Sequence, residues 1–400
     1  MKHIAKTLLF LLIVPNFVFA QEYNKCGSLD TNRIQEELLL RGDHWGYGYQ
    51  DLLKDLIRWE ASSYLTIDSI GASVQNRTLW ELRISDNNSN EKKHIIYIHV
   101  RTHPNEVQSF WVADEIIKFL ISDAVLAQIL RTNCIFYIVP MYNPDGVELE
   151  YARENANKID IESNWYADSI QPEVRTLRRR FVQLMGSDKP IELALNLHSA
   201  YKCKRYFVYH HENGTSKKYT KIEKLFINSV VRYFARGIQP WNFIITWKNG
   251  TPKKYPESWW WLNFKEKVLA LTYEDGNCEE AGEYDKTAFA ILSGIGEYFN
   301  ILTPSSIVEN KTTAKFEFLI SPNPVKSGKE ILIKIVLSQK QKVKFEIFDI
   351  NGHKVSNLFN GIMKEGTTEL KFNTSNILHG YYFYKFTSPT KQNIKRLIIL

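Results

Sequence analysis

Two residues with the chemistry of metal ligands, His103 and Glu106, lie in a polar turn between two apolar segments. Residues 95–100 are rich in Ile, Val and Tyr and predict a buried strand, and residues 107–120 repeat apolar side chains at helical spacing. The turn therefore lies at the carboxyl end of a strand, where open α/β sheets bind their ligands. An imidazole and a carboxylate on one turn can both reach a divalent cation, and zinc accepts this mixture. By themselves the two residues also fit a solvated turn.

Two further predicted strands end in residues of the same kind. Residues 191–197 form an apolar run that ends at His198, and residues 268–273 form another that ends at Glu274. Two histidines and a glutamate would leave one zinc position open for water, which is typical of catalytic zinc. Zinc lowers the pKa of such a water toward about 7, and Glu274 is the candidate base that takes its proton. On the strand pattern alone, His198 also fits a core histidine, and Glu274 fits a surface residue beside Asp275.

The elements that must position these residues alternate between strand and helix over residues 49–300. This alternation predicts an α/β fold, in which a mixed, mostly parallel sheet is sandwiched by helices. After the main body, apolar residues recur at every second position, as in residues 331–335, and Asn351-Gly352 is a strong hairpin signal. This pattern predicts a small antiparallel β-sandwich. The predicted division of the chain is a signal peptide (1–20), an α/β domain (21–302), a linker (303–318) and a β-sandwich domain (319–400).

The composition and charge argue for a folded protein that does not bind nucleic acid. Hydrophobic residues make up 44% and aromatic residues 13% of the 400 residues, which is typical of a protein with a packed core. The formal net charge is +7, but the chain from Pro304 onward contains 15 Lys and Arg against 7 Asp and Glu. The main body is therefore close to neutral, and we expect no nucleic-acid partner for it.

The first residues have the pattern of an export signal. A basic start, an apolar core over residues 8–14 and Val18-Phe19-Ala20 before Gln21 are typical of a secretory signal peptide. No later segment approaches the roughly 18 consecutive apolar residues that a transmembrane helix requires. We therefore expect a protein that is secreted or displayed at the cell surface, without a transmembrane segment.

An oxidising compartment would permit disulfides among the four cysteines, Cys26, Cys134, Cys203 and Cys278. Cys203 and Cys278 each follow a strand-end site residue by four or five positions. Both would then lie at one rim of the site, which favours this pair; free buried thiols are the alternative.

Residues 49 to about 300 resemble the zinc carboxypeptidases of the M14 (carboxypeptidase A/D-like) family. The resemblance is carried by pieces in a specific order and spacing: Ile70-Gly71-Ala72-Ser73 with Arg77, His103-Pro104-Asn105-Glu106, Asn143-Pro144-Asp145-Gly146, Arg153-x-Asn155, Asp160-Ile161-x-x-Asn164-Trp165, Leu197-His198-Ser199 and Tyr273-Glu274.

The resemblance implies a zinc site and assigns roles around it. It implies one zinc ion per chain, bound by His103, Glu106 and His198, with Glu274 as general base. Arg153 falls where the family has the arginine that polarises the substrate carbonyl and steadies the oxyanion. Asp160 falls where the family has the carboxylate that orients the first histidine ligand.

The chain departs from the family at the residues that select the end of the substrate. After Asp160 the family usually has an Asn-Arg pair that grips a terminal carboxylate, but this chain has Glu162 and Ser163. Glu162 would repel a carboxylate unless it were protonated or paired, so we expect a substrate with a cation near the scissile bond or a peptide cut internally. Asn155 and Tyr255 are further candidate substrate-binding residues, Tyr255 as the tyrosine that closes over the substrate.

The C-terminal segment resembles the type A sorting domain of the Bacteroidetes type IX secretion system. The resemblance implies export by that machinery and removal of the segment on secretion or surface attachment. A carbohydrate- or protein-binding sandwich is the alternative. The pieces that carry the resemblance are Ser321-Pro322-Asn323-Pro324, Ile347-Phe348-Asp349-Ile350-Asn351-Gly352, Leu378-His379-Gly380-Tyr381-Tyr382 and Lys395-Arg396-Leu397-Ile398-Ile399.

Together these features predict a secreted zinc-dependent metallopeptidase of the carboxypeptidase type that hydrolyses a peptide or amide bond. One alternative is an amidase that acts on muropeptides or on other amides without a free C-terminal carboxylate. A further alternative is a binding protein that has the fold but no turnover, although a binding protein would have no use for Glu274.

Overall fold

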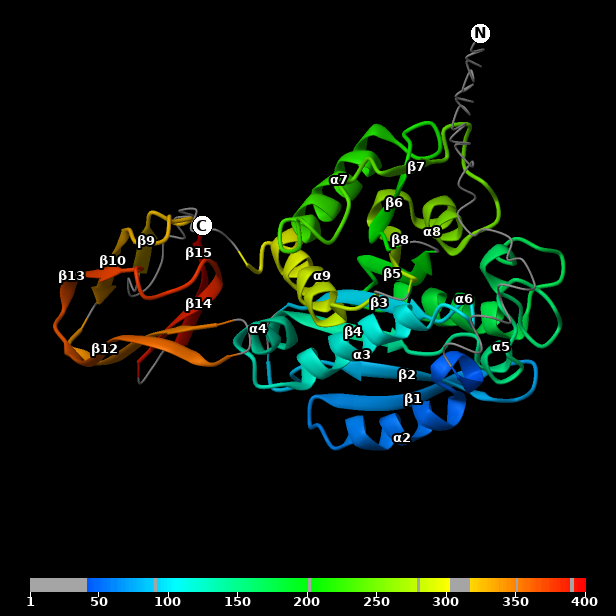
Figure 1. The fold of residues 1–400 in the computed structure, drawn as a ribbon, viewed down its shortest axis with the longest axis horizontal. Helices are drawn as coiled ribbons and strands as arrows, with labels where there is room; N and C mark the ends of the chain where they lie inside the picture. Colours follow the sequence, from blue (N-terminus) through cyan, green and yellow to red (C-terminus); the bar gives the residue numbers. More distant parts are fainter. Residues whose placement is uncertain are drawn as a thin grey trace, which may run out of the picture.

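The computed structural model describes residues 42–89, 92–200, 203–278, 281–302, 317–337, 339–349, 352–388 and 392–400. The predicted signal peptide, Cys26 and residues 303–316 of the predicted linker lie outside the described residues. Figure 1 shows a larger α/β domain and, on the left, a smaller domain made of strands.

An eight-stranded mixed sheet forms the centre of the α/β domain, with the order β1-β2-β4-β3-β5-β8-β6-β7. The four central strands β4, β3, β5 and β8 run parallel to one another. β1 and β2 pair antiparallel with their neighbours, whereas β6 is antiparallel to β8 and parallel to β7. The strands are β1 (Leu65–Ala72), β2 (Thr78–Ile84), β3 (His94–Val100), β4 (Cys134–Val139), β5 (Leu193–Ala200), β6 (Tyr206–His210), β7 (Ile244–Thr246) and β8 (Leu269–Gly276).

Helices cover both faces of this sheet, as the alternation of elements predicts. One core cluster joins the sheet to α2, α3, α4, α7 and α9, and the other joins it to α6 and α8. The helices are η1 (Asp43–Gly46), α2 (Tyr49–Glu60), α3 (Val107–Ile121), α4 (Val125–Asn133), α5 (Pro144–Glu148), η2 (Ile161–Ser163), α6 (Pro172–Met185), α7 (Lys217–Val231), α8 (Pro256–Phe264), η3 (Lys265–Lys267) and α9 (Tyr284–Tyr298).

Successive side chains of each central strand point to opposite faces of the sheet. In β5, Leu195 and Leu197 pack into the cluster of α3 and α9, whereas Ala194 packs into the cluster of α6 and α8. Asn196 and His198 therefore point to the α6/α8 face. This alternation brings polar residues of β3, β5 and β8 together on one face.

Seven strands form the C-terminal domain, and they make two sheets, β13-β10-β9 and β12-β11-β14-β15. Neighbouring strands pair antiparallel in both sheets, and apolar side chains from both sheets share one core, so the predicted antiparallel β-sandwich is confirmed. The strands are β9 (Glu317–Ser321), β10 (Glu330–Leu337), β11 (Gln341–Phe348), β12 (Lys354–Met363), β13 (Gly366–Asn373), β14 (Gly380–Thr387) and β15 (Gln392–Ile399).

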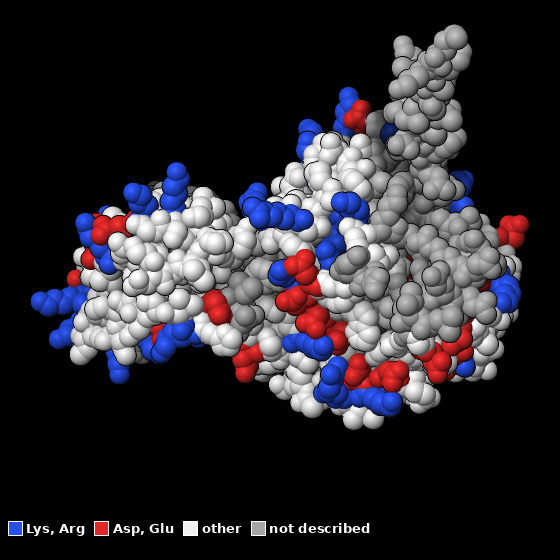
Figure 2. Space-filling model, viewed as in Figure 1, with Lys and Arg blue, Asp and Glu red and all other residues white. Residues whose placement is uncertain are grey.

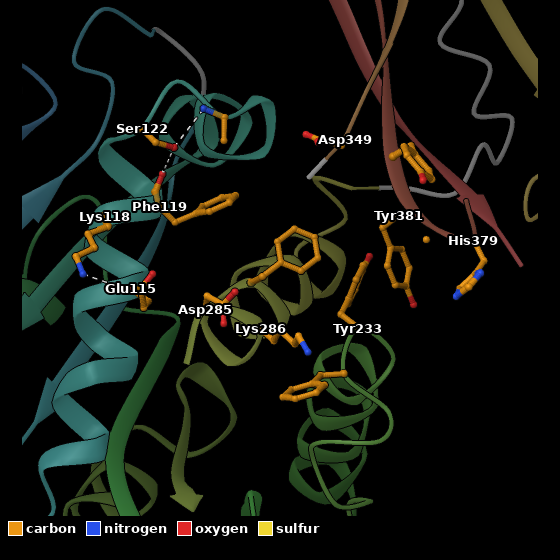
Figure 3. A pocket seen from close by; sticks show the side chains of 15 residues that line it. Glu115, Lys118, Phe119, Ser122, Tyr233, Asp285, Lys286, Asp349, His379 and Tyr381 are labelled. Carbon is orange, nitrogen blue, oxygen red and sulfur yellow. Dashed lines mark hydrogen bonds and ion pairs between the residues drawn. The ribbon is translucent and has the colours of Figure 1, made fainter. Parts of the chain in front are cut away.

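The C-terminal domain contacts the α/β domain through aromatic side chains. The ring of Tyr381 lies 4.7 Å from the ring of Tyr233, and its hydroxyl donates a hydrogen bond to the carbonyl of Arg232 at 2.6 Å. A cavity of about 620 Å³ lies at this contact, lined by residues of α3, α9 and β14 among others (Figure 3).

Lys and Arg side chains gather on the visible face of the C-terminal domain (Figure 2). Within the described part of the chain, no helix is both long enough and apolar enough to cross a membrane.

Candidate metal centre

The first two candidate ligands lie in the turn between β3 and α3. β3 ends at Val100, and Arg101 then adopts a left-handed conformation with φ 59°. The buried guanidinium of Arg101 donates to the carbonyl of Pro104 at 2.6 Å, which ties the turn to its own start. Glu106 is the residue that precedes the first turn of α3. The turn therefore presents both His103 and Glu106 at the carboxyl end of the strand, as predicted.

The third candidate ligand, His198, comes from the end of β5 and meets the other two. The Nδ1 atoms of His103 and His198 lie 2.8 Å from the two carboxylate oxygens of Glu106, and they lie 3.1 Å from each other. All candidate ligand atoms of this triad are within 4.8 Å of one another, and all three residues are buried. His198 is therefore not an isolated core histidine.

The triad fits a zinc ion by its donors and by its spacing. Two imidazole nitrogens and one carboxylate are a ligand set of catalytic zinc. Two Zn–N bonds at a tetrahedral angle would place their nitrogen atoms about 3.3 Å apart, close to the 3.1 Å between the two Nδ1 atoms. Burial alone would raise the pKa of Glu106, but the imidazoles of His103 and His198 outweigh burial and hold that pKa well below its usual value.

Asp160 and Arg153 lie behind His103. The Nε2 atom of His103 lies 3.3 Å from Oδ1 of Asp160 and 2.8 Å from a guanidinium nitrogen of Arg153, which in turn donates to Asp160 at 2.9 Å. Burial alone would raise the pKa of Asp160, but His103 and Arg153 outweigh it, so the pKa is well below its usual value. A carboxylate on Nε2 leaves Nδ1 of His103 free to bind a metal. Arg153 is partly exposed, with 17% of its side chain open to solvent.

Glu274 lies beside His198 in the register of β5 and β8, and its side chain is buried. Because the two residues are direct neighbours on parallel strands, their side chains point to the same face of the sheet. The candidate base is thus placed next to the candidate ligands.

Glu162 is buried in this structure, and its expected contact with the substrate stays a prediction. Its exposed fraction is 1%, and its Oε2 accepts a hydrogen bond from the side chain of Asn196 at 3.1 Å. Ser163, the other departure from the family, is half-buried. A cation on the substrate would therefore not meet Glu162 without a rearrangement of this turn.

The side chain of Asn155 is engaged inside its own loop. It donates to Gln171 at 2.9 Å and to Glu173 at 3.0 Å, and its oxygen accepts from the backbone amides of Asn157 and Ile159. Because these four bonds use its full hydrogen-bonding capacity, Asn155 shapes the loop and has no donor or acceptor left for a substrate.

Tyr255, the proposed closing tyrosine, precedes α8 and is half-buried. Its backbone amide donates a hydrogen bond to the hydroxyl of Ser258 at 2.9 Å. The role of the Tyr255 side chain over a substrate stays a prediction.

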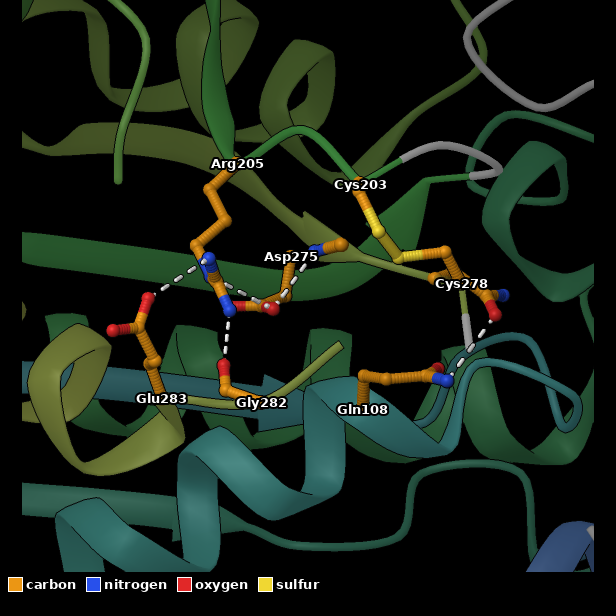
Figure 4. The surroundings of a disulfide bond; sticks show 9 residues. Gln108, Cys203, Arg205, Asp275, Cys278, Gly282 and Glu283 are labelled. Atoms are coloured by element: carbon orange, nitrogen blue, oxygen red, sulfur yellow. Dashed lines mark hydrogen bonds and ion pairs between the residues drawn. A yellow bond between two sulfur atoms is a disulfide. The ribbon is translucent and has the colours of Figure 1, made fainter. Parts of the chain in front are cut away.

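The disulfide Cys203–Cys278 is formed, as the sequence positions favoured (Figure 4). It joins the segment after β5 to the segment after β8, and its Cα atoms are 5.5 Å apart. Close to it, Arg205 donates to both carboxylate oxygens of Asp275 at 3.2 Å. Asp275 is therefore a buried partner of Arg205 and does not form a surface pair with Glu274. Cys134 is a free buried thiol.

Sequence reasoning missed a set of polar residues below the ligands. Asn196 and Thr272 lie two residues before His198 and Glu274 on the same strands and in the same register row. Glu257 of α8 reaches this row, where it accepts hydrogen bonds from Asn196 at 3.1 Å and from Thr272. A polar residue two positions before a site residue, on an otherwise apolar strand, was the available signal. We call Asn196, Glu162, Glu257 and Thr272 the polar layer.

A buried His₂Glu cluster at the carboxyl ends of a mixed α/β sheet, with a carboxylate in register beside it, defines the class of zinc-dependent hydrolases. Residues 53–259, over half of the chain, match the family model described as zinc carboxypeptidase. The chain belongs to the zinc carboxypeptidase family, peptidase family M14. Residues 319–400 match the secretion system C-terminal sorting domain. Both resemblances seen in the sequence are thereby confirmed.

Individual relatives agree with this assignment. The chain is 31% identical over 161 residues to cytosolic carboxypeptidase 6 of Mus musculus, which covers 39% of this chain and 30% of the mouse protein. It is 27% identical over 173 residues to cytosolic carboxypeptidase 2 of Xenopus tropicalis, 41% of this chain and 18% of that protein. The chain thus matches less than a third of the length of these curated relatives.

Solved structures share the fold. A metallo-carboxypeptidase from Burkholderia cenocepacia superposes with a TM-score of 0.55 at 18% identity, over 64% of this chain and 69% of that chain. A metallo-carboxypeptidase from Pseudomonas aeruginosa, in complex with (2-guanidinoethylmercapto)succinic acid, superposes with a TM-score of 0.52 at 20% identity. The superposition covers 64% of this chain and 70% of that chain. The α/β domain therefore has the metallocarboxypeptidase fold.

Proposed function

We propose that the chain is an exported zinc-dependent hydrolase of the carboxypeptidase type, which cleaves a peptide or amide bond. The observation that carries the proposal is the meeting of His103, Glu106 and His198 within 4.8 Å, with Glu274 in register beside His198. Family membership supports the same reaction class.

The residues divide the chemistry among them. Zinc, when bound by the triad, would lower the pKa of a water toward about 7 and polarise the scissile carbonyl. Glu274 takes a proton from the attacking water and returns it to the leaving amine. Arg153 donates hydrogen bonds to the carbonyl oxygen as negative charge develops on it. Asp160 fixes the ring of His103 so that Nδ1 faces the metal.

The residues at the family's carboxylate-binding positions bear on which end of the substrate the enzyme accepts. Ser163 carries no charge where the family has its carboxylate-binding arginine. Arg205 is engaged elsewhere, because its Nε donates to both carboxylate oxygens of Asp275 and its Nη2 donates to the carbonyl of Gly282. The serine at this position, together with the engagement of Arg205, favours a second candidate function, an amide hydrolase that needs no free C-terminal carboxylate, with muropeptides as one such substrate class.

A substrate panel tests the proposal. The purified protein is assayed on one peptide with a free C-terminus, on its C-terminally amidated form and on a muropeptide, before and after removal of metal with a chelator. We expect turnover that the chelator abolishes and that one equivalent of zinc restores. Preference for the amidated form or the muropeptide selects the second candidate. Stoichiometric zinc binding without turnover on the panel would contradict the hydrolase and point to a binding protein.

A single substitution sharpens the question of the substrate end. Ser163→Arg would place a guanidinium at the position where the family binds the terminal carboxylate. We expect it to raise kcat/KM for the free-acid peptide and to leave the amidated peptide unchanged. Equal effects on both peptides would mean that this position does not read the substrate terminus.

The C-terminal sorting domain supports export to the cell surface or beyond. We infer that the type IX secretion machinery is the partner that reads this domain, after a signal peptide over residues 1–20 has directed the chain across the inner membrane. Detection of the protein outside the cell, and its retention when residues 319–400 are deleted, would test this inference.

A further inference from the structure

One short turn carries two carboxylates that face the two histidines of the triad. Asp160 precedes the single turn η2, and Glu162 lies within it. Oδ1 of Asp160 lies 3.3 Å from Nε2 of His103, and Oε2 of Glu162 lies 3.4 Å from Nε2 of His198. In each histidine, Nε2 is the nitrogen that points away from the triad.

The environment of His198 leaves Glu162 as the group that can hold its ring. Nε2 of His198 is buried and forms no conventional hydrogen bond within the described residues. Glu162 approaches it from the α6/α8 side, and the exposed fractions of both side chains are 1%. A buried imidazole N–H without an acceptor is costly, so a carboxylate at this place has a clear physical use.

The polar layer fixes Glu162 in this position. The side-chain amide of Asn196 donates to Oε2 of Glu162 at 3.1 Å and to Oε1 of Glu257 at 3.1 Å. Thr272 also donates to Glu257. Because Asn196 lies two residues before His198 on β5, the strand that supplies the ligand also supplies the donor that aims its carboxylate.

We propose that Glu162 is the positioning residue of His198, so that the turn over residues 160–162 orients both histidine ligands at once. The partner of one imidazole nitrogen decides which tautomer the ring adopts and therefore which nitrogen binds a metal. A carboxylate on Nε2 holds the proton there and presents Nδ1 to the ion. A residue that the family uses near the substrate terminus thus serves the metal in this chain, which also explains why Glu162 is buried.

The inference rests on the proposed zinc site, and its test measures metal binding directly. Glu162→Gln preserves size and replaces the carboxylate oxygen with a weaker acceptor. Losing such a partner typically lowers metal affinity about 10- to 100-fold. We expect that range for the zinc Kd of Glu162→Gln, measured by competition with a chromophoric chelator at one pH, together with an altered visible spectrum of the cobalt-substituted protein. Asp160→Asn, which acts on His103, should give a change of the same order.

Glu223→Gln is the matched control, because Glu223 also pairs with a histidine in the α/β domain. Its Oε1 lies 2.6 Å from Nδ1 of His210, and both side chains are fully buried. His210 is not a candidate ligand, so this variant reports what the same chemical change does to the fold alone. We expect a lower thermal midpoint for Glu223→Gln and an unchanged zinc Kd and cobalt spectrum.

The outcomes separate the two levels of the proposal. If the unsubstituted protein binds no zinc, the proposed function fails. If it binds one zinc and Glu162→Gln matches Glu223→Gln in zinc Kd, the positioning role of Glu162 is overturned while the zinc site stands. Should Glu162→Gln fold poorly, the dissociation rate of zinc from Glu162→Asp is compared with that from the unsubstituted protein. We expect faster release from Glu162→Asp, because its carboxylate is shorter. An equal rate contradicts the positioning role of Glu162.

Discussion

The two domains both build β-strands with alternating side chains, but they bury very different residues on the covered face. In the C-terminal sandwich, Ile331, Ile333 and Ile335 of β10 all point into an apolar core. In the α/β domain, β5 points Asn196 and His198 into the α6/α8 face. Among the described residues of the C-terminal domain, only Glu346 and Thr374 are buried polar or charged residues.

This difference indicates that the buried charged residues mark the functional site of the chain. Burying a charge is costly unless it is paired or bound to a metal, so a domain with many buried charges must use them. The α/β domain buries Glu106, Glu162, Glu257 and Glu274 around one site. In the described part of the C-terminal domain, Glu346 is the only charged residue that is buried.

The largest effect that should separate the two regions is on turnover. Glu274→Gln removes the proposed base but keeps the size of the side chain, and general base catalysis contributes about 10²- to 10⁴-fold. We expect kcat to fall by that factor and the zinc content to stay at one per chain, measured by substrate turnover and elemental analysis of the same preparation. Unchanged turnover would remove Glu274 from the mechanism.

The disulfide gives the next largest effect, on stability. Cys203 and Cys278 are 75 residues apart in the chain, and closing a loop of that length stabilises a fold by about 4 kcal/mol in the chain-entropy model. Replacing both with serine should lower the unfolding free energy of the α/β domain by that order, measured by denaturant unfolding. Reductant should reproduce the loss in the unsubstituted protein and leave the double variant unaffected; a stabilisation that survives reductant would contradict the prediction.

The meeting of the triad residues and the central strands could be predicted from the sequence because the features that indicate them are local. His103, Glu106, His198 and Glu274 each follow an apolar run, and the carboxyl ends of parallel strands meet at one edge of a sheet. The class of fold, a mixed sheet covered by helices and followed by a sandwich, is confirmed for the same reason: a period of two or of 3.6 in the apolar residues is visible along the chain.

Two features could not be predicted from the sequence: the direction in which the Glu162 side chain points, and the helix α8. The turn η2 sets the direction of the Glu162 side chain. A single turn is too short to show a periodic pattern, so the sequence does not indicate which of its side chains are buried. The helix α8 was missed because Trp259, Trp260 and Trp261 are all buried, so it has no polar face to mark its period. Glu257, which α8 carries into the polar layer, was missed with it.

The buried side chain of His99 should make the stability of the α/β domain depend on pH. Burial lowers the pKa of His99 to about 4, although the nearby carboxylates of Glu162 and Glu257 act in the opposite direction. Because an unfolded histidine has a pKa near 6.5, the neutral ring contributes full stability above pH 6.5, and this contribution is lost as the pH falls from 6.5 to 4. A difference of that size corresponds to about 3 kcal/mol.

His99→Phe tests this pH dependence, because a phenyl ring can replace the edge-on contact of His99 with Tyr142. The unfolding free energy is measured in urea at several pH values between 7 and 4. We expect the variant to lose less stability than the unsubstituted protein across this window, by up to about 3 kcal/mol. Parallel curves for the two proteins would show that His99 does not titrate on unfolding.

The smallest effect should come from Glu346, the one buried carboxylate among the described residues of the C-terminal sandwich. Glu346 lies 3.0 Å from Lys344 and 3.6 Å from Lys354, and both lysines are about half exposed. Ion pairs with such solvated partners contribute less than about 1 kcal/mol, in contrast to the buried carboxylates of the metal centre. Glu346→Gln should therefore shift the unfolding transition of the C-terminal domain by less than about 1 kcal/mol and leave zinc content and turnover unchanged. A loss of turnover in this variant would mean that the two domains are energetically coupled and that the contrast between them is incomplete.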